Sequence, residues 1–142
     1  MNMQSPYPMG LEALAVRCEA ASEPSVELDG LSAAATGAMS AAHFVAWEEY
    51  QINGHSWKPS DPVPVPPSRY TASLDAAMTL VPDGNGRWPQ VEYIGPNPNN
   101  KAVGHRWRIW LEGRPRMTGH SLASAALALT AAALRARASV QS

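Results

Sequence analysis

AVGHRWRIWL, residues Ala102 to Leu111, shows the clearest structural pattern in this 142-residue chain. Successive side chains of a β-strand point to opposite faces of a sheet, so alternate residues share a face. One face of this stretch is mainly apolar and consists of Val103, His105, Trp107, Ile109 and Leu111. The other face combines arginine with tryptophan and consists of Gly104, Arg106, Arg108 and Trp110. The alternation predicts a strand with one face in the core and a polar, aromatic face outside.

The flanking segments predict the rest of an antiparallel sheet. Arg87 to Ile94 (RWPQVEYI) alternates as a strand does, and Pro89 within it indicates an edge strand or an early kink. Gly95 to Asn100 (GPNPNN) is rich in residues that end a strand, so we expect the loop of a hairpin there. After a turn at Glu112-Gly113, Arg114 to Thr118 predicts a third short strand.

Two helices are predicted near the start of the chain. Gly10 to Ala21 (GLEALAVRCEAA) has apolar residues at helical spacing on one face, with Glu12 and Glu19 pointing away from that face. Ser25 is then placed to cap a second, weaker amphipathic stretch over residues 26–37.

The middle of the chain predicts two further helices and a stiff connection. Ala41 to Tyr50 (AAHFVAWEEY) has aromatic residues three apart, which fits a helix, although its composition would also suit a strand. Pro59 to Pro67 (PSDPVPVPP) predicts a strap of extended polyproline II that crosses a surface, and its recognition by an aromatic groove is the alternative. Thr71 or Ser73 is expected to cap a short helix from Leu74 to Val81.

An alanine-rich segment predicts the last helix. Gly119 to Ser121 is expected to lead into it, with Ser121 as the N-cap. The apolar stripe of this helix consists of Leu122, Ala126, Leu129 and Ala133. Arg135 and Arg137 follow near its C-terminal end, where cations interact favourably with the helix dipole. Together these elements predict an α+β fold, in which an antiparallel sheet of about three or more strands packs with helices in a layered sandwich.

Length, charge and cysteine content narrow the class of protein. A chain of 142 residues fits a single domain over residues 1–142, since domains commonly run to about 100–200 residues. Lys plus Arg total 11 against 12 for Asp plus Glu, which argues against nucleic acid as the partner. One cysteine, Cys18, allows no internal disulfide. No segment reaches the ~20 apolar residues that span a bilayer, and Met1 to Met9 lacks the pattern of a signal peptide, so we expect a cytoplasmic protein.

Side chains that could carry catalysis or hold a metal form no recognisable motif. The histidines are His43, His55, His105 and His120. They are too widely spaced for a compact metal motif such as His-x-x-x-His. The sequence also lacks a nucleophile elbow, a Gly-x-x-x-x-Gly-Lys loop and a paired-cysteine motif. We therefore expect no enzyme, no metal and no cofactor, and a ribonuclease-like pair of His105 and His120 with Arg116 is the catalytic alternative.

Charge is distributed unevenly and gathers on the predicted hairpin. Residues 87–116 carry six basic and two acidic side chains, whereas residues 1–86 carry three basic and ten acidic. Arginine pairs bidentately with phosphate or carboxylate, and an indole stacks on a flat ring, a combination that suits a nucleotide. The candidate ligand-binding residues are Trp88, Arg106, Arg108, Trp110, Arg114 and Arg116. The alternative is a solvated sheet face on which arginine stems lie over tryptophan.

Three segments carry a family resemblance. They are RYTASLDAAMTLVP at Arg69 to Pro82, ASAALALTAAALRAR at Ala123 to Arg137, and the opening run Gly10 to Ala21. In their order and approximate separation they resemble the phage ABA sandwich domain family, small proteins of tailed phages and prophages. The resemblance implies helices layered on an antiparallel sheet. Residues 37–67 then form an insert that ends in the proline-rich strap at 59–67, and Asp83 to Trp88 departs from the acidic-Gly-Trp sequence common in the family.

The resemblance also implies a function. We expect an oligomeric phage accessory protein, in the cytoplasm of an infected bacterium, that counters host defence by binding and sequestering a small anionic nucleotide-type immune signal. A protein-binding inhibitor or adaptor that acts on a host defence complex is the main alternative, and a minor virion or packaging component is the third. Sequestration requires a preformed pocket, an inhibitor requires an exposed apolar or charged patch, and a virion component requires self-assembly.

The assignment of the two faces of Ala102 to Leu111 is tested by Trp107→Ala. We expect this large-to-small change on the core face to lower the free energy of unfolding by roughly 3–5 kcal/mol. Chemical denaturation followed by circular dichroism measures the change. A near-neutral result for Trp107→Ala would mean that the two faces are reversed.

Overall fold

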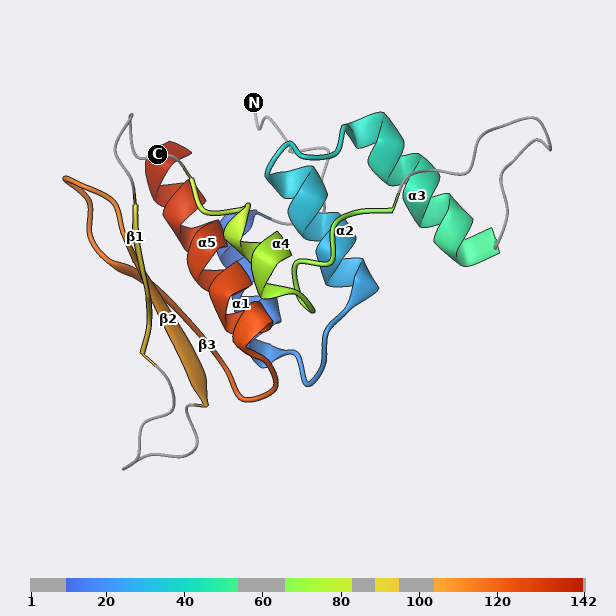
Figure 1. Cartoon of the computed structure of the whole chain (residues 1–142). Helices are drawn as coiled ribbons and strands as arrows, with labels where there is room; N and C mark the ends of the chain where they lie inside the picture. Colours follow the sequence, from blue (N-terminus) through green and yellow to red (C-terminus); the bar gives the residue numbers. More distant parts are fainter. Residues whose placement is uncertain (1–9, 54–65, 83–88, 95–103, 142) are drawn as a thin grey trace.

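A three-stranded antiparallel sheet forms around the strand that the alternation predicts. The computed structural model describes residues 10–53, 66–82, 89–94 and 104–141. In it, β2 (His105–Trp110) lies between β1 (Gln90–Tyr93) and β3 (Met117–Ser121) and runs antiparallel to both. The helices lie to one side of this sheet (Figure 1), so the predicted α+β class is confirmed.

The strand register assigns each side chain of β2 to a face. Ile109 pairs with Val91 across β1 and with Met117 across β3. Ile109 and Leu111 are buried, and Trp107 is half-buried and packs against the same core. The apolar face that alternation predicts for this strand is therefore confirmed, because its side chains meet the hydrophobic core.

Helix α5 (Ala125–Gln141) covers this apolar face of the sheet (Figure 1). Every residue from Ala126 to Leu134 is buried, since small side chains let the helix lie close to its neighbours. The closest approach is at Gly119 of β3, where a Cβ atom would lie 2.5 Å from Ala132 N and 3.0 Å from Ala131 Cβ. Only glycine fits there, so the sheet and the helix meet backbone against backbone.

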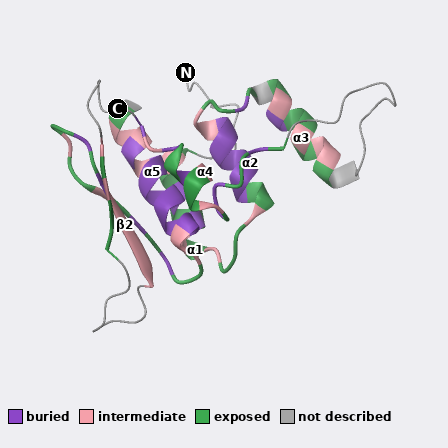
Figure 2. Ribbon diagram, viewed as in Figure 1, coloured by how far each residue is buried: buried purple, intermediate pink, exposed green. Residues whose placement is uncertain are grey.

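Four further helices of the described residues stack on the other side of α5. Both α1 (Leu11–Ala20) and α4 (Leu74–Met78) pack against α5, α2 (Val26–Ala35) packs against α1, and α3 (Ala41–Asn53) packs against α2. The sheet and α3 thus lie at opposite ends of the molecule (Figure 1). Buried residues concentrate in α5 and α2, whereas α3 contributes Phe44 and is otherwise exposed or half-buried over residues 42–51 (Figure 2).

A buried polar link fastens α2 to the segment that precedes α4. The backbone N–H of Thr71 and its hydroxyl both donate to Asp29 Oδ1, at 2.9 and 2.8 Å. The hydroxyl oxygen in turn accepts a hydrogen bond from Ser25 N at 2.9 Å. Burial raises the pKa of Asp29 above its usual range, and the hydrogen bonds from Thr71 offset part of that rise. The link holds the N-terminal half of α2 in a fixed position.

The final helix begins later than the sequence predicts. Ser121, expected as its N-cap, is instead the last residue of β3, where it pairs with His105. The cap is Ser124, whose Oγ accepts from the backbone N–H groups of residues 126 and 127 at 3.1 and 3.3 Å. Leu122, expected in the apolar stripe, is 67% exposed in the connection. Pairing with β2 keeps the chain extended through Ser121, which moves the start of the helix.

Other boundaries differ by a few residues or lie outside the described residues. The predicted third strand at Arg114 to Thr118 begins later and is Met117–Ser121, and the short helix predicted to reach Val81 ends at Met78. The helices predicted at 10–21, 26–37 and 41–50 are confirmed, although their ends shift. Most of the proline-rich strap and the hairpin loop at Gly95 to Asn100 lie outside the described residues.

Gly119→Ala tests the backbone contact between β3 and α5. We expect the added methyl group to force the two elements apart and to lower the free energy of unfolding by at least about 2 kcal/mol, as overpacking of a tight core does. Thermal and chemical denaturation measure the effect. Gly10→Ala is the control, because no atom lies within 4 Å of a Cβ there, and we expect a change below about 1 kcal/mol. Equal effects of the two substitutions would contradict the contact.

Candidate functional site

The sheet face that points away from α5 carries some of the predicted arginine and tryptophan side chains. Arg108 and Trp110 alternate with the core residues of β2 and therefore share this outer face. Across β1, Glu92 pairs with Arg108 and Gln90 pairs with Trp110. No helix of the described part of the chain covers this face (Figure 1). Within the described residues, Trp110 is 43% exposed on this face.

Part of the outer face forms a small pocket. It has a volume of about 120 Å³ and is lined by Gln90, Glu92, Arg108, Trp110 and Arg116. Arg116 lies over the indole of Trp110, with its Cζ atom 4.8 Å from the ring centroid. Arg108 Nε donates to Glu92 Oε1 at 3.0 Å, and Arg108 Nη2 contacts the same oxygen. Two guanidinium groups thus converge with one carboxylate of the neighbouring strand.

The ion pair of Arg108 and Glu92 shows which ligand chemistry the pocket suits. A guanidinium pairs with carboxylate or phosphate oxygens. Two of the three guanidinium nitrogens of Arg108, Nε and Nη2, already face Glu92. The side chains are 34% and 57% exposed. Such exposed pairs contribute only about 0–1 kcal/mol to stability. An anionic ligand can therefore replace Glu92 on Arg108 at little cost to the fold.

The Arg116–Trp110 pair positions a second cation in this pocket. Trp110 is 43% exposed, and the guanidinium over its ring gains a cation–π attraction of about 0.5–1 kcal/mol. A stacked guanidinium keeps its in-plane N–H groups available for hydrogen bonds. Arg116 therefore presents donors at the pocket, while it covers part of the indole surface on which a flat ring was expected to stack.

The other predicted site residues do not line this pocket. Arg114 donates to the carbonyl oxygen of Ser139, near the C-terminal end of α5, which commits its guanidinium to that helix. Arg106 shares the outer face but lies opposite His120 of β3. Trp88 lies outside the described residues. The structure thus brings together Arg108, Trp110 and Arg116 of the six predicted residues.

Two residues that line the pocket were not predicted from the sequence. Gln90 and Glu92 line the pocket from β1, although only arginine and tryptophan were expected there. The alternation within RWPQVEYI could have placed both on one strand face, but assigning them to Arg108 and Trp110 also requires the register of β1 against β2. That register is a tertiary property of the sheet.

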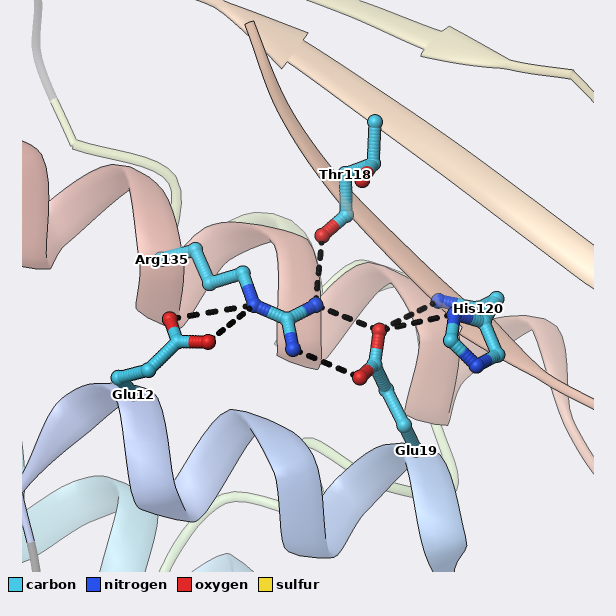
Figure 3. A network of polar contacts seen from close by, with 5 residues as sticks. All are labelled: Glu12, Glu19, Thr118, His120 and Arg135. Carbon is cyan, nitrogen blue, oxygen red and sulfur yellow. Dashed lines mark hydrogen bonds and ion pairs between the residues drawn. The ribbon is translucent and has the colours of Figure 1, made fainter.

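A second polar cluster lies at the edge of β3 and centres on Arg135 of α5 (Figure 3). Its guanidinium donates to both carboxylate oxygens of Glu19 at 2.5 and 2.7 Å, to Glu12 at 3.0 Å, and to the carbonyl oxygen of Thr118 at 2.8 Å. Glu19 Oε2 also accepts from the backbone N–H of His120 at 3.2 Å and lies 3.1 Å from its Nδ1. These contacts join α1, α5 and β3.

The cluster corrects three expectations from the sequence. Glu19 does not point away from the core, since its side chain is 9% exposed and lies under Arg135. Arg135 itself serves as the partner of Glu19 and Glu12 rather than as a cation for the helix dipole, and the hydrogen bonds to Glu19 raise its pKa above the usual value. His120 belongs to β3 and not to the entry of the helix. The cluster fastens the fold.

The described residues offer little that could carry catalysis. His105 and His120 lie on opposite faces of the sheet, because His105 pairs with Ser121 while His120 pairs with Arg106. His105 is instead hydrogen-bonded to the Tyr93 hydroxyl at 2.9 Å. Burial raises the pKa of the Cys18 thiol to about 12, so it is not a nucleophile at neutral pH. No group of His, Cys, Asp and Glu within the described residues could hold a metal ion.

Comparisons with known proteins do not assign the chain to a family. No family model, curated protein or solved structure matches the chain. The resemblance to the phage ABA sandwich domain family therefore stays a prediction from the three segments that carry it. None of the helices in the described ranges has the length and apolar content that crossing a membrane requires.

Arg135→Met tests whether the buried cluster stabilises the fold. The substitution leaves Glu19 buried without its cation, and we expect a loss of about 3–5 kcal/mol in the free energy of unfolding. Arg17→Met is the matched control, because the Arg17–Glu27 pair is exposed and such pairs contribute about 0–1 kcal/mol. Urea denaturation of both variants measures the difference. Losses of similar size would contradict a special role for Arg135.

Proposed function

We propose that this protein binds a small anionic, nucleotide-type ligand on the open face of its sheet and holds it without chemical conversion. The single observation that carries the proposal is the convergence of Arg108 and Arg116 beside Trp110 in an exposed pocket. Guanidinium groups in such an arrangement bind phosphate or carboxylate through paired, charge-assisted hydrogen bonds. The lack of a catalytic constellation in the described residues favours binding over turnover.

In this proposal Glu92 holds the place of the ligand's anion. Its Oε1 sits on Arg108 in the position that a phosphate oxygen would take. Binding then exchanges one anion for another on Arg108, and Glu92 turns towards solvent. The internal carboxylate lowers affinity, because the ligand must displace it before the guanidinium is available.

The size of the pocket limits what one chain can enclose. About 120 Å³ lies below the roughly 300–1,000 Å³ of typical small-molecule pockets. In the proposal the pocket takes one anionic group, and the rest of the ligand lies along the open sheet face towards Arg106. A second copy of the chain would supply the remaining wall, which fits the expected homo-oligomer.

The biological setting rests on the sequence alone. The segments that resemble the phage ABA sandwich domain family support a phage accessory protein in the cytoplasm of an infected bacterium. Sequestration of a nucleotide immune signal would there counter host defence. Cyclic ADP-ribose and cyclic oligonucleotides are signals of the proposed chemistry, since each combines phosphates with flat rings.

A second candidate function is supported by the shape of the same face. The pocket is shallow and small, while Trp110 is 43% exposed beside Arg116. Tryptophan and arginine are the residue types that contribute most to binding energy at protein interfaces. A protein-binding inhibitor or adaptor that acts on a host defence complex would use this patch as its contact surface.

The proposal is tested with Arg108→Ala and Glu92→Gln. We expect Arg108→Ala to weaken ligand binding at least about tenfold, because a charge-assisted hydrogen bond contributes roughly 1.5–3 kcal/mol. Glu92→Gln removes the competing charge and should strengthen binding. Isothermal titration calorimetry with cyclic ADP-ribose and with a cyclic dinucleotide measures both effects, and Arg17→Ala, a cation on α1, is the control expected to bind as the unmodified protein does.

Native mass spectrometry identifies the ligand independently. Protein purified from bacteria that make such a signal should carry a stoichiometric small molecule, whose mass is read after denaturation. A protein mass without any ligand, together with no heat of binding for either probe, would reject sequestration. The protein-partner function would then be tested by whether Trp110→Ala removes binding to a defence complex.

A further inference from the structure

We propose that the groove between α2 and α3 is a second binding site, which takes a small organic cation with an apolar body. The groove lies at the end of the molecule opposite to the sheet (Figure 1), so it is independent of the anion pocket. Its volume is about 280 Å³. Phe44 and Trp47 of α3 form one wall, and Gly30 of α2, where a Cβ atom would touch both rings, also lines the groove.

Gly30 is the residue that leaves the groove open. Glycine inside a helix costs roughly 0.5–1 kcal/mol relative to alanine, so its presence in the middle of α2 needs a reason. Close packing does not require glycine at this position. A Cβ atom at Gly30 would lie 3.5 Å from Trp47 Cδ1 and 3.6 Å from Phe44 Cε1, which are ordinary contact distances. Alanine would therefore fit and would fill the space beside the two rings. We infer that the glycine keeps that space available.

The aromatic wall is built to receive an apolar or cationic group. Phe44 is 8% exposed and anchors α3 in the core, while Trp47 is half-buried and borders the groove. Trp47 stacks on Tyr50 with ring centroids 6.1 Å apart, which holds its indole in place. Tryptophan is the aromatic side chain that attracts a cation most strongly.

Charge at the rim selects a cation over a neutral or anionic ligand. Glu27 and Glu48 both line the groove, and among its lining residues in the described part of the chain none is Lys, Arg or His. Glu27 Oε1 already accepts from Arg17 Nη2 at 3.1 Å, so Glu48 is the carboxylate assigned to the ligand. A cation above Trp47 would thus meet an indole and a carboxylate together.

The dimensions of the groove indicate the size of the ligand. About 280 Å³ is near the lower end of the roughly 300–1,000 Å³ range of small-molecule pockets. One aromatic ring or short alkyl chain with an ammonium group fits such a space. The proposed ligand is therefore a free small molecule, a substituted ammonium ion.

The proposal is tested with benzyltrimethylammonium as the probe. Nuclear magnetic resonance of the full chain should show a saturable shift of the Trp47 indole N–H resonance, assigned with Trp47→Phe. Benzyl alcohol and benzoate, which share the ring but not the positive charge, should bind at least about fivefold more weakly, as the loss of a cation–π contact predicts. Equal affinities for benzyltrimethylammonium and benzyl alcohol, or no shift with any probe, would overturn the proposal.

Three variants locate the site. Gly30→Ala should weaken binding of the probe at least about tenfold while leaving the melting temperature the same or higher, since alanine favours a helix. Glu48→Gln should weaken binding up to about fivefold, as loss of an exposed ion pair does, and Glu49→Gln, which removes the same charge one residue along α3, is its matched control and should leave binding unchanged. Unchanged binding in Gly30→Ala would place the probe elsewhere and reject the groove. Arg108→Ala, on the sheet, should not affect this titration, so the two sites succeed or fail separately.

Discussion

The contact between β3 and α5 at Gly119 is the constraint on which the rest of the structure depends. Because the glycine has no side chain, the strand backbone lies directly on the alanine-rich surface of the helix. This approach places α5 across the apolar face of the sheet and buries Ile109 of the central strand β2 and Leu111, which directly follows that strand. It also determines which face of the sheet stays open, since α5 can cover only one. The position of the candidate anion pocket is thus a consequence of helix packing.

The hydrogen bonds and ion pairs of Arg135 fix how the helices and the sheet are oriented relative to one another. Hydrophobic burial holds α5 on the sheet but has little directional preference. The bidentate pairing of Arg135 with Glu19, together with its bond to the carbonyl oxygen of Thr118, sets the position of α1 relative to both elements. His120 joins the same carboxylate at the exposed edge of β3. Side chains that the sequence suggested for surface or catalytic roles therefore maintain the fold.

The two candidate sites have opposite chemistry and lie at opposite ends of the molecule. On the sheet, Arg108 and Arg116 lie beside Trp110, and Glu92 pairs with Arg108, an arrangement that in the proposed function takes an anion. Between α2 and α3, a tryptophan with a nearby carboxylate suits a cation. The two sites have no lining residue in common.

The helices, the strands and the chemistry of the outer sheet face could be predicted from sequence patterns alone. Alternation in β2, apolar spacing in the helices and the clustering of arginine are local patterns, and backbone geometry converts them directly into faces. Only the tertiary structure decided the start of α5, because pairing with β2 extends β3 through Ser121, and only the strand register placed Glu92 on Arg108. The partners of Arg135 and the neighbours of Gly30 were equally inaccessible, since Glu19 and Arg135 are 116 residues apart in the chain. Local sequence patterns cannot predict such contacts, because the contacts form only when the helices pack together.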